Sequence, residues 1–386
     1  SEPNATSTAK ASSAPNATST AKVSSTPDTT ATAKVSSVPD ATTKPSVSPT
    51  QTPSSVTTQT PTPTPMQGGS LSASHEKPAS ADSYTLKVGK MSVSLGMTEA
   101  EVKASIGAAP DRTDTSPLGM TEYIYNPSKD YTNYLLIQFA DGKVVGMSTI
   151  SAYFCYDNVV SAGDSVSTLT GKGFGTGTVS TYYQAVDADN NKKGTSAYLL
   201  KQDNASVIAF SDYWGGKDTY GVYVYSNAYA LDTLSQPKKG TYTTDVLTAM
   251  GTQAFEMMNA FRVYKSMKPL IRDAKGDKVA LAHSQALAQG RSDGTYKGDA
   301  GRLVMADIDY QFAGEFEYES CASGIAAAHS FIHKQDSRYA LMNRNTSGNV
   351  LSDDDGTYLY TYIGVGAAYD NAGKTFVTFD IYNIFD

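Results

Sequence analysis

The sequence predicts an α+β protein with three parts: a disordered N-terminal tail, a small α+β domain, and a C-terminal domain of helices packed over a sheet. Three observations support this prediction. Eleven of the 16 prolines lie before residue 80 and no aromatic residue precedes Tyr84, so the first fifth of the chain cannot build a core. Strand-like runs joined by turn residues fill about 83–236. Helical spacing of apolar residues dominates from about 241 and gives way to Tyr-, Val- and Thr-rich strands.

The composition excludes some classes of partner. The formal charge is −7, from 31 Lys+Arg against 38 Asp+Glu. The chain therefore lacks the excess of positive charge that attracts a phosphate backbone, and we expect no nucleic-acid binding. No apolar run reaches the length of a membrane span and no leader stands at Ser1, so any signal peptide has been removed. Cys155 and Cys321 are too few for a disulfide scaffold. Two separate thiols are expected, with a bridge between them as the alternative.

The tail, residues 1–81, reads as a spacer. Prolines recur every twelve residues from Pro3 to Pro39, and a Thr/Pro/Ser tract continues over 45–65. Such sequences favour polyproline-II conformers, and fully extended the segment would reach on the order of 200 Å. That reach suits a protein tethered at one end. Dense hydroxyls and the acceptor patterns at Asn4 and Asn16 invite glycosylation, and an unmodified linker explains them equally well.

The second part, 83–236, is predicted to contain two helix-plus-hairpin units. Thr98 and Glu101 form a capping-box pattern, and Gly107 closes the short helix that follows. Two β-rich runs then meet at Asp141-Gly142, a strong hairpin signal. The same helix-plus-hairpin pattern recurs more weakly from Gly163 through three further strand-like runs.

This order of motifs resembles a known bacterial domain. Gly96-Met97-Thr98 with Pro110, then Tyr123-x-Tyr125 and a hairpin ending in Asp-Gly-Lys-Val-Val, is similar to the CAP-associated N-terminal domain of bacterial secreted proteins. The likeness covers about 87–225, and the small repeats of the β-lactamase-inhibitor-protein type are a more distant match. Tyr213 and Trp214 could present a binding face, although tyrosines that cover the sheet core are the simpler interpretation.

In the third part, 241–386, apolar spacing predicts a helix over Val246–Val263, a second over Lys278–Gln289 and a third over Ser323–Lys334, followed by strands. The segment also resembles the CAP domain, the SCP-like family of cysteine-rich secretory, antigen-5 and pathogenesis-related proteins, in a cysteine-poor bacterial form. The resemblance covers about 135 residues and implies an α-β-α sandwich. Its motifs are Asn259-x-x-Arg262, Lys268-Pro269-Leu270-x-x-Asp273, His283-Ser284, Gly314-Glu315-Phe316, Ser337-Arg338 and Tyr362 to Asp380.

The resemblance also implies a cleft, usually lined by two histidines and two acidic residues that can bind a divalent metal. No histidine lies between Ser284 and Glu315, and Thr295 stands near the expected place. Ser337 stands where the second histidine should precede Arg338. Only Glu315 keeps its family chemistry, so we expect a degenerate cleft with no metal and no cofactor.

Other residues offer weaker candidates. His329 and His333 lie four apart on one helix face and could chelate a metal with an acidic third ligand. The alternative is that His329 packs under the sheet while His333 caps the helix or meets solvent. His283 and Ser284 are neighbours on a helix and point about 100° apart, so they do not form a dyad.

The alternating run Glu315, Glu317, Glu319 places three carboxylates on one face of a strand. Close like charges could support acid-base chemistry, and a solvated strand edge explains the same pattern. The acidic run 353–355 reads as a turn rather than a calcium loop, and Asn345 is a further glycosylation pattern.

We therefore expect a secreted or envelope-tethered binding module. Its ligand would be a cell-wall glycan, a lipid or a protein, and the candidate binding residues are Glu315, Ser337, Arg338, His329 and His333. One alternative is a hydrolase of wall or protein substrates, with Glu315 as general base assisted by Ser337 or a histidine-bound metal. Another is a surface-display protein on a glycosylated stalk. The oligomeric state stays open.

Overall fold

The computed structural model describes residues 84–126, 130–177, 179, 183–229, 240–291, 302–304, 306–308, 310–344 and 360–384. These residues all belong to one compact unit. The predicted tail, Thr295, Asn345 and the acidic run 353–355 lie outside the described residues. No helix in the described part of the chain is long and apolar enough to cross a membrane.

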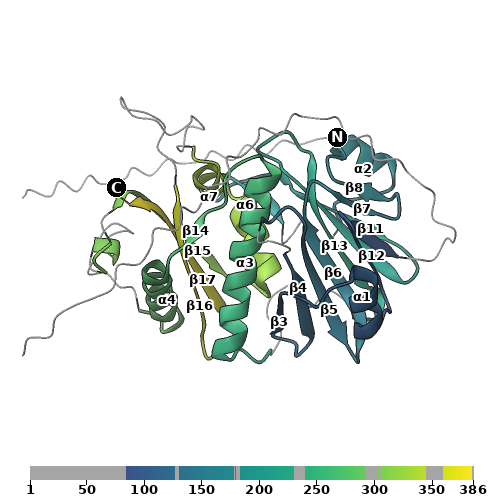
Figure 1. Cartoon of the computed structure of the whole chain (residues 1–386). Helices are drawn as coiled ribbons and strands as arrows, with labels where there is room; N and C mark the ends of the chain where they lie inside the picture. The colour runs from purple at the N-terminus through teal and green to yellow at the C-terminus, as the bar shows by residue number, and fades with distance from the viewer. Residues whose placement is uncertain are drawn as a thin grey trace, which may run out of the picture. The chain divides into compact units, whose positions relative to one another are not determined.

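Residues 84–229 form three sheets with short helices (Figure 1). A seven-stranded antiparallel sheet has the order β11-β12-β13-β6-β5-β4-β3, a four-stranded one has the order β2-β1-β7-β8, and β9 and β10 form a two-stranded sheet. Helix α1 precedes the first group of strands of the large sheet, and α2 precedes the second. The elements are β1 (Thr85–Val88), β2 (Met91–Ser94), α1 (Glu99–Ile106), β3 (Arg112–Thr115), β4 (Thr121–Tyr125), β5 (Tyr134–Ala140), β6 (Lys143–Ile150), β7 (Phe154–Tyr156), β8 (Val160–Ser161), α2 (Val166–Gly171), β9 (Gln184–Val186), β10 (Lys192–Thr195), β11 (Ala197–Lys201), β12 (Ala205–Ser211), β13 (Thr219–Ser226) and η3 (Asn227–Tyr229).

Local sequence signals place these elements. Thr98 and Glu101 form the predicted capping box of α1, and Gly107 ends the helix at φ 76°. The β5–β6 hairpin turns at Asp141 and Gly142, which have φ values of 50° and 72°. Two positive φ angles are what a two-residue hairpin turn requires, because that turn matches the twist of the strands. The helix-plus-hairpin arrangement is confirmed in both units.

Residues 240–384 form the predicted α-β-α sandwich around a sheet of order β14-β16-β17-β15. Helix α4 covers one face, and α3, α6 and α7 cover the other (Figure 1). Ser323, where the third helix is predicted to begin, caps α6, while α4 starts four residues before its predicted start because Asp273 accepts the N–H groups of Lys275 and Gly276. The elements are α3 (Thr244–Tyr264), β14 (Ile271–Arg272), α4 (Ala274–Ala288), β15 (Tyr310–Glu319), α6 (Gly324–His333), α7 (Gln335–Leu341), β16 (Tyr362–Tyr369) and β17 (Thr375–Ile384).

The two regions share a hydrophobic core. One face of the large sheet packs within its own region, around Leu135, Val207 and Val224. The opposite face, with Phe210 and Tyr220, belongs to a single apolar cluster that also contains residues of α3, α6, β16 and β17. The predicted boundary between the two domains falls near residues 230–239, outside the described residues, and stays a prediction.

The two cysteines are separate thiols. Cys155 is half-buried on β7 and Cys321 is buried just before α6, and both are free. Burial raises the pKa of the Cys321 thiol to about 12, so this thiol stays protonated and unreactive at neutral pH.

Candidate functional site

A polar cluster lies between α4 and β15, around Glu315, which the sequence predicts to keep the cleft chemistry that the resemblance implies. β15 is extended, so Glu315 and Glu317 project from the same face. His283 projects toward them from the buried side of α4, and Arg302 approaches Glu315 from the segment 302–304. The alternating acidic pattern therefore does place carboxylates together, and it adds a histidine that the sequence reasoning set aside.

Glycines bring α4 close enough for this contact. A Cβ added at Gly364 would lie 2.2 Å from the carbonyl carbon of Gly276, and one added at Gly366 would lie 2.1 Å from the backbone nitrogen of Leu281. Any larger residue on this face of β16 would push the helix away from the sheet. The Ser284 hydroxyl completes the contact through hydrogen bonds to the Gly366 carbonyl and the Thr378 hydroxyl. Ser284 is thus a packing residue and, as expected, no partner of His283.

Arg302 and Glu315 form the ion pair at the centre of the cluster. The Arg302 guanidinium donates to both carboxylate oxygens of Glu315, with 2.8 Å between Nε and Oε2. His283 Nε2 contacts the Glu317 carboxylate and lies 3.6 Å from Glu315 Oε1. The side chains of His283 and Glu315 are only 3% and 8% exposed, whereas that of Glu317 is 42% exposed. A buried carboxylate needs such a partner, because an unpaired buried charge is costly.

Three side chains of the cluster carry donor atoms of the kind that bind metals. Ligand atoms of His283, Glu315 and Glu317 all lie within 4.8 Å of one another, and imidazole with carboxylate is a common combination for zinc. However, Arg302 already supplies positive charge and occupies both oxygens of Glu315. A divalent ion would have to displace the guanidinium, so these residues do not fit a metal as they are arranged.

His329 and His333 lie elsewhere, on the side of α6 that faces the large sheet. The Tyr220 hydroxyl lies 2.8 Å from His329 Nδ1 and 2.9 Å from His333 Nε2. His329 also stacks on Phe210, with ring centroids 3.5 Å apart. His329 is buried, as the alternative interpretation proposed, but the expectation that His333 caps the helix or meets solvent is wrong, since it is only 2% exposed. Burial lowers the pKa of both rings, that of His333 to about 3.

Ser337 and Arg338 lie in two further places. The Ser337 hydroxyl donates to the Phe331 carbonyl and hydrogen-bonds the Tyr318 hydroxyl at 2.6 Å. Tyr318 and Glu315 occupy opposite faces of β15. The sequence-based pairing of Glu315 with Ser337 as base and assistant is therefore wrong in its geometry.

Arg338 joins the two regions. It donates to Asp212, in the turn after β12, with 2.7 Å between Nη2 and Oδ2, and Lys265 Nζ lies 2.8 Å from the same oxygen. Trp214, which was considered for a binding face, donates from Nε1 to the His333 carbonyl at 2.8 Å. His329 and His333 share Tyr220, whereas Glu315, Ser337 and Arg338 each lie elsewhere, so the five candidate binding residues do not form one site.

Glu319 fits the simpler interpretation of the acidic run. β15 is an edge strand of its sheet, and the side chain of Glu319 is 55% exposed and paired with Lys374. Glu315 and Glu317 take part in the cluster with His283, and Glu319 lies outside it.

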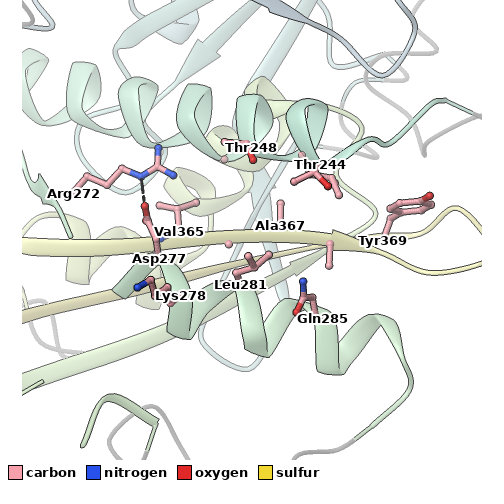
Figure 2. Close-up of a pocket in the computed structure, with 14 residues that line it drawn as sticks. Thr244, Thr248, Arg272, Asp277, Lys278, Leu281, Gln285, Val365, Ala367 and Tyr369 are labelled. Carbon is pink, nitrogen blue, oxygen red and sulfur yellow. Dashed lines mark hydrogen bonds and ion pairs between the residues drawn. The ribbon is translucent and has the colours of Figure 1, made fainter. Parts of the chain in front are cut away.

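Sequence reasoning missed a groove on the outer edge of β16. A cavity of about 370 Å³ lies between α3 and α4, with Val365–Tyr369 as its floor. Figure 2 shows Thr244 and Thr248 on the α3 side and Leu281 and Gln285 on the α4 side. Its volume lies within the range of small-ligand sites. The signal in the sequence was the apolar Leu281, which breaks the polar face of α4 and is 39% exposed.

Comparisons with known proteins agree with this architecture. Residues 95–233 match the family model described as CAP-associated N-terminal, within the predicted range 83–236. An extracellular protein containing an SCP domain from Bacillus anthracis superposes with a TM-score of 0.57 at 18% identity, covering 80% of this chain and 99% of that one. A cysteine-rich secretory protein from Staphylococcus aureus gives a TM-score of 0.53 at 14% identity, covering 75% and 91%. No curated protein sequence gives a significant match.

The class of fold follows from these observations: residues 240–384 have the fold of the SCP-domain structures and are joined to a small α+β region with a large sheet of its own. That preceding region matches the CAP-associated N-terminal family model over residues 95–233.

Proposed function

We propose that this protein is an extracellular binding module of the bacterial cell envelope. The observation that supports the proposal is the groove between α3 and α4, which has an apolar rim in Leu281 and Tyr369, 39% and 45% exposed. Exposed apolar side chains gathered at a cavity are typical of a surface that another molecule covers. The repetitive N-terminal spacer holds this surface at a distance from an anchor, and the ligand is a wall glycan, a lipid or a protein.

The polar cluster supports binding over hydrolysis. A general base needs a carboxylate that is free to take a proton within hydrogen-bond reach. Both oxygens of Glu315 accept hydrogen bonds from Arg302. The cluster therefore serves to fasten β15 to the helix side of the domain.

One observation favours the alternative, a hydrolase. His283 contacts Glu317, whose side chain is 42% exposed, and a histidine oriented by a carboxylate is a frequent acid-base unit. Hydrolysis of wall or protein substrates that disappears in both His283→Gln and Glu317→Gln, with folding intact, would establish this function in place of binding.

The test of the binding function uses the full chain on three surfaces: purified bacterial cell walls, phosphatidylglycerol vesicles and an extract of surface proteins. Retention on at least one surface is expected, and Leu281→Glu should reduce it about tenfold. Leu118→Glu is the matched control, because Leu118 is 45% exposed and lies on the other region. Loss in neither variant, or no retention on any surface, would contradict the proposal. A carbohydrate mass confined to the tail, with no retention, would favour the display protein.

A further inference from the structure

The floor of the groove is an open strand edge. β16 pairs with β17 along its whole length, but on its other side β14 pairs only with Tyr362 and Ile363. β14 stops at Arg272 because Asp273 caps α4 and the chain turns into the helix. Among the described residues, no strand pairs with Val365–Tyr369 on this side. The strand position beside this edge is therefore filled by β14 at Tyr362 and Ile363 and is vacant along Val365–Tyr369.

Alternate residues of β16 direct their backbone groups away from β17 and toward the vacant position. Val365 N–H donates to Asp277 Oδ1 at 2.8 Å, on the side away from β17, and Asp370 N–H donates to the Lys374 carbonyl at 2.9 Å, on the β17 side. Residues of a strand alternate in the side to which their N–H and C=O groups point. Ala367 and Tyr369 therefore present donors and acceptors to the groove. Exposed strand edges of this kind pair readily with another extended chain.

We infer that the α3–α4 groove binds an extended peptide segment of a partner protein, which adds to β16 as a strand in line with β14. This inference rests on the proposed binding function and names its ligand class. Strand addition of this type takes affinity from main-chain hydrogen bonds and specificity from alternate side chains. The five residues Val365–Tyr369 offer about 17 Å of edge, at about 3.4 Å per residue.

The surroundings of the edge select this occupant over others. A second copy of the chain would bring its own β16, recessed between the same two helices (Figure 2), so the two edges would not meet. An acyl chain would cover the backbone donors and acceptors without satisfying them, which is unfavourable. A peptide strand satisfies them and sends alternate side chains toward Leu247 on α3 and Leu281 on α4.

Charge sets a preference at the β14 end. Arg272 is paired with Asp277 at 2.9 Å, whereas Lys278 is exposed on the rim. The three side chains together carry one net positive charge. An acidic residue at the end of the peptide that lies against Lys278 complements this charge.

The first experiment measures fluorescence polarisation of labelled heptapeptides with the full chain. The array carries Val, Thr, Ser or Ala along its length and Glu, Gln or Lys at one end. Peptides that end in Glu are expected to bind several-fold more tightly than those that end in Lys. The tightest peptide is then made in two N-methylated forms of the same composition, one methylated on the odd-numbered amides and the other on the even-numbered amides. Each form loses the hydrogen-bond donors along one edge of the peptide strand, and the two forms lose opposite edges. One form should bind within twofold of the parent and the other at least tenfold more weakly. No binding across the array, or equal binding of both forms, would overturn the inference.

The second experiment locates the pairing. Hydrogen exchange at the Ala367 and Tyr369 amides should slow at least tenfold when the peptide binds. Exchange at the Gly366 and Ala368 amides, which face β17, should change little. Leu281→Glu should weaken the peptide about tenfold, and Leu118→Glu should not. If the peptides fail while wall or vesicle retention survives and still depends on Leu281, the inference is wrong and the binding function stands.

Discussion

The ion-pair network between the two regions gives the sharpest stability test. Asp212 is 1% exposed and faces two cations, Arg338 at 2.7 Å and Lys265 at 2.8 Å. These cations hold the pKa of Asp212 below its usual value against the effect of burial. Asp212→Asn keeps the shape of the side chain and removes the charge, so that Arg338 is left buried and uncompensated. Breaking a buried pair in this way costs about 3–5 kcal/mol of unfolding free energy.

The assay is urea unfolding followed by tryptophan fluorescence. Trp214 is the only tryptophan of the chain and lies two residues from Asp212, so its emission reports on the same contact. Glu319→Gln is the matched control, because it neutralises a carboxylate in an exposed pair, where the cost is below about 1 kcal/mol. Adding Arg338→Met to Asp212→Asn should recover part of the loss. A loss in Asp212→Asn no larger than that in Glu319→Gln would refute the reasoning.

Three further outcomes are expected from the buried polar groups and the tight helix contact. Because burial keeps the pKa of His329 and His333 far below 6.5, the unfolded chain binds more protons below that pH, and unfolding free energy should fall from pH 7 to pH 5. The fall is at most about 1.4 kcal/mol per histidine per pH unit. Glu122, whose pKa burial raises, opposes part of it, and urea midpoints that stay level or rise toward pH 5 would contradict the argument. Tyr220→Phe removes the hydroxyl that both rings share and should cost about 1–3 kcal/mol in the same assay, so an unchanged midpoint would count against the hydrogen bonds. Gly366→Val places side-chain atoms where α4 runs, and circular dichroism should show loss of cooperative thermal unfolding or a markedly lower Tm, whereas an unaltered Tm would show that the helix can move.

The sequence predicts the elements that local chemistry defines. The capping box at Thr98, the turn at Asp141-Gly142 and the start of the third helix at Ser323 each depend on residues within a few positions of one another. A hydroxyl that caps a helix or a pair of residues that adopts positive φ acts without help from distant parts of the chain. These predictions are confirmed for that reason.

The candidate site is less predictable because it depends on which faces meet. The alternation of Glu315 and Glu317 gives the correct face of β15, but nothing local identifies His283 as the residue opposite it. The close glycines Gly364 and Gly366 were the available signal, since two glycines on one face of a strand indicate that backbone approaches there. His329 shows the same limit, because its partners Tyr220 and Phe210 lie more than a hundred residues away, in the other region.

The doubly covered sheet has a practical consequence for anyone who divides this protein. One face of the seven-stranded sheet packs against its own region, and the opposite face packs against α3 and α6. Cutting the chain between residues 229 and 240 would separate these two surfaces. Each fragment would then expose to water the broad apolar surface that is buried between the sheet and the helices. We expect neither fragment to stay monomeric in solution. Proteolysis between residues 229 and 240 should therefore destabilise both regions and should not release two independently folded domains.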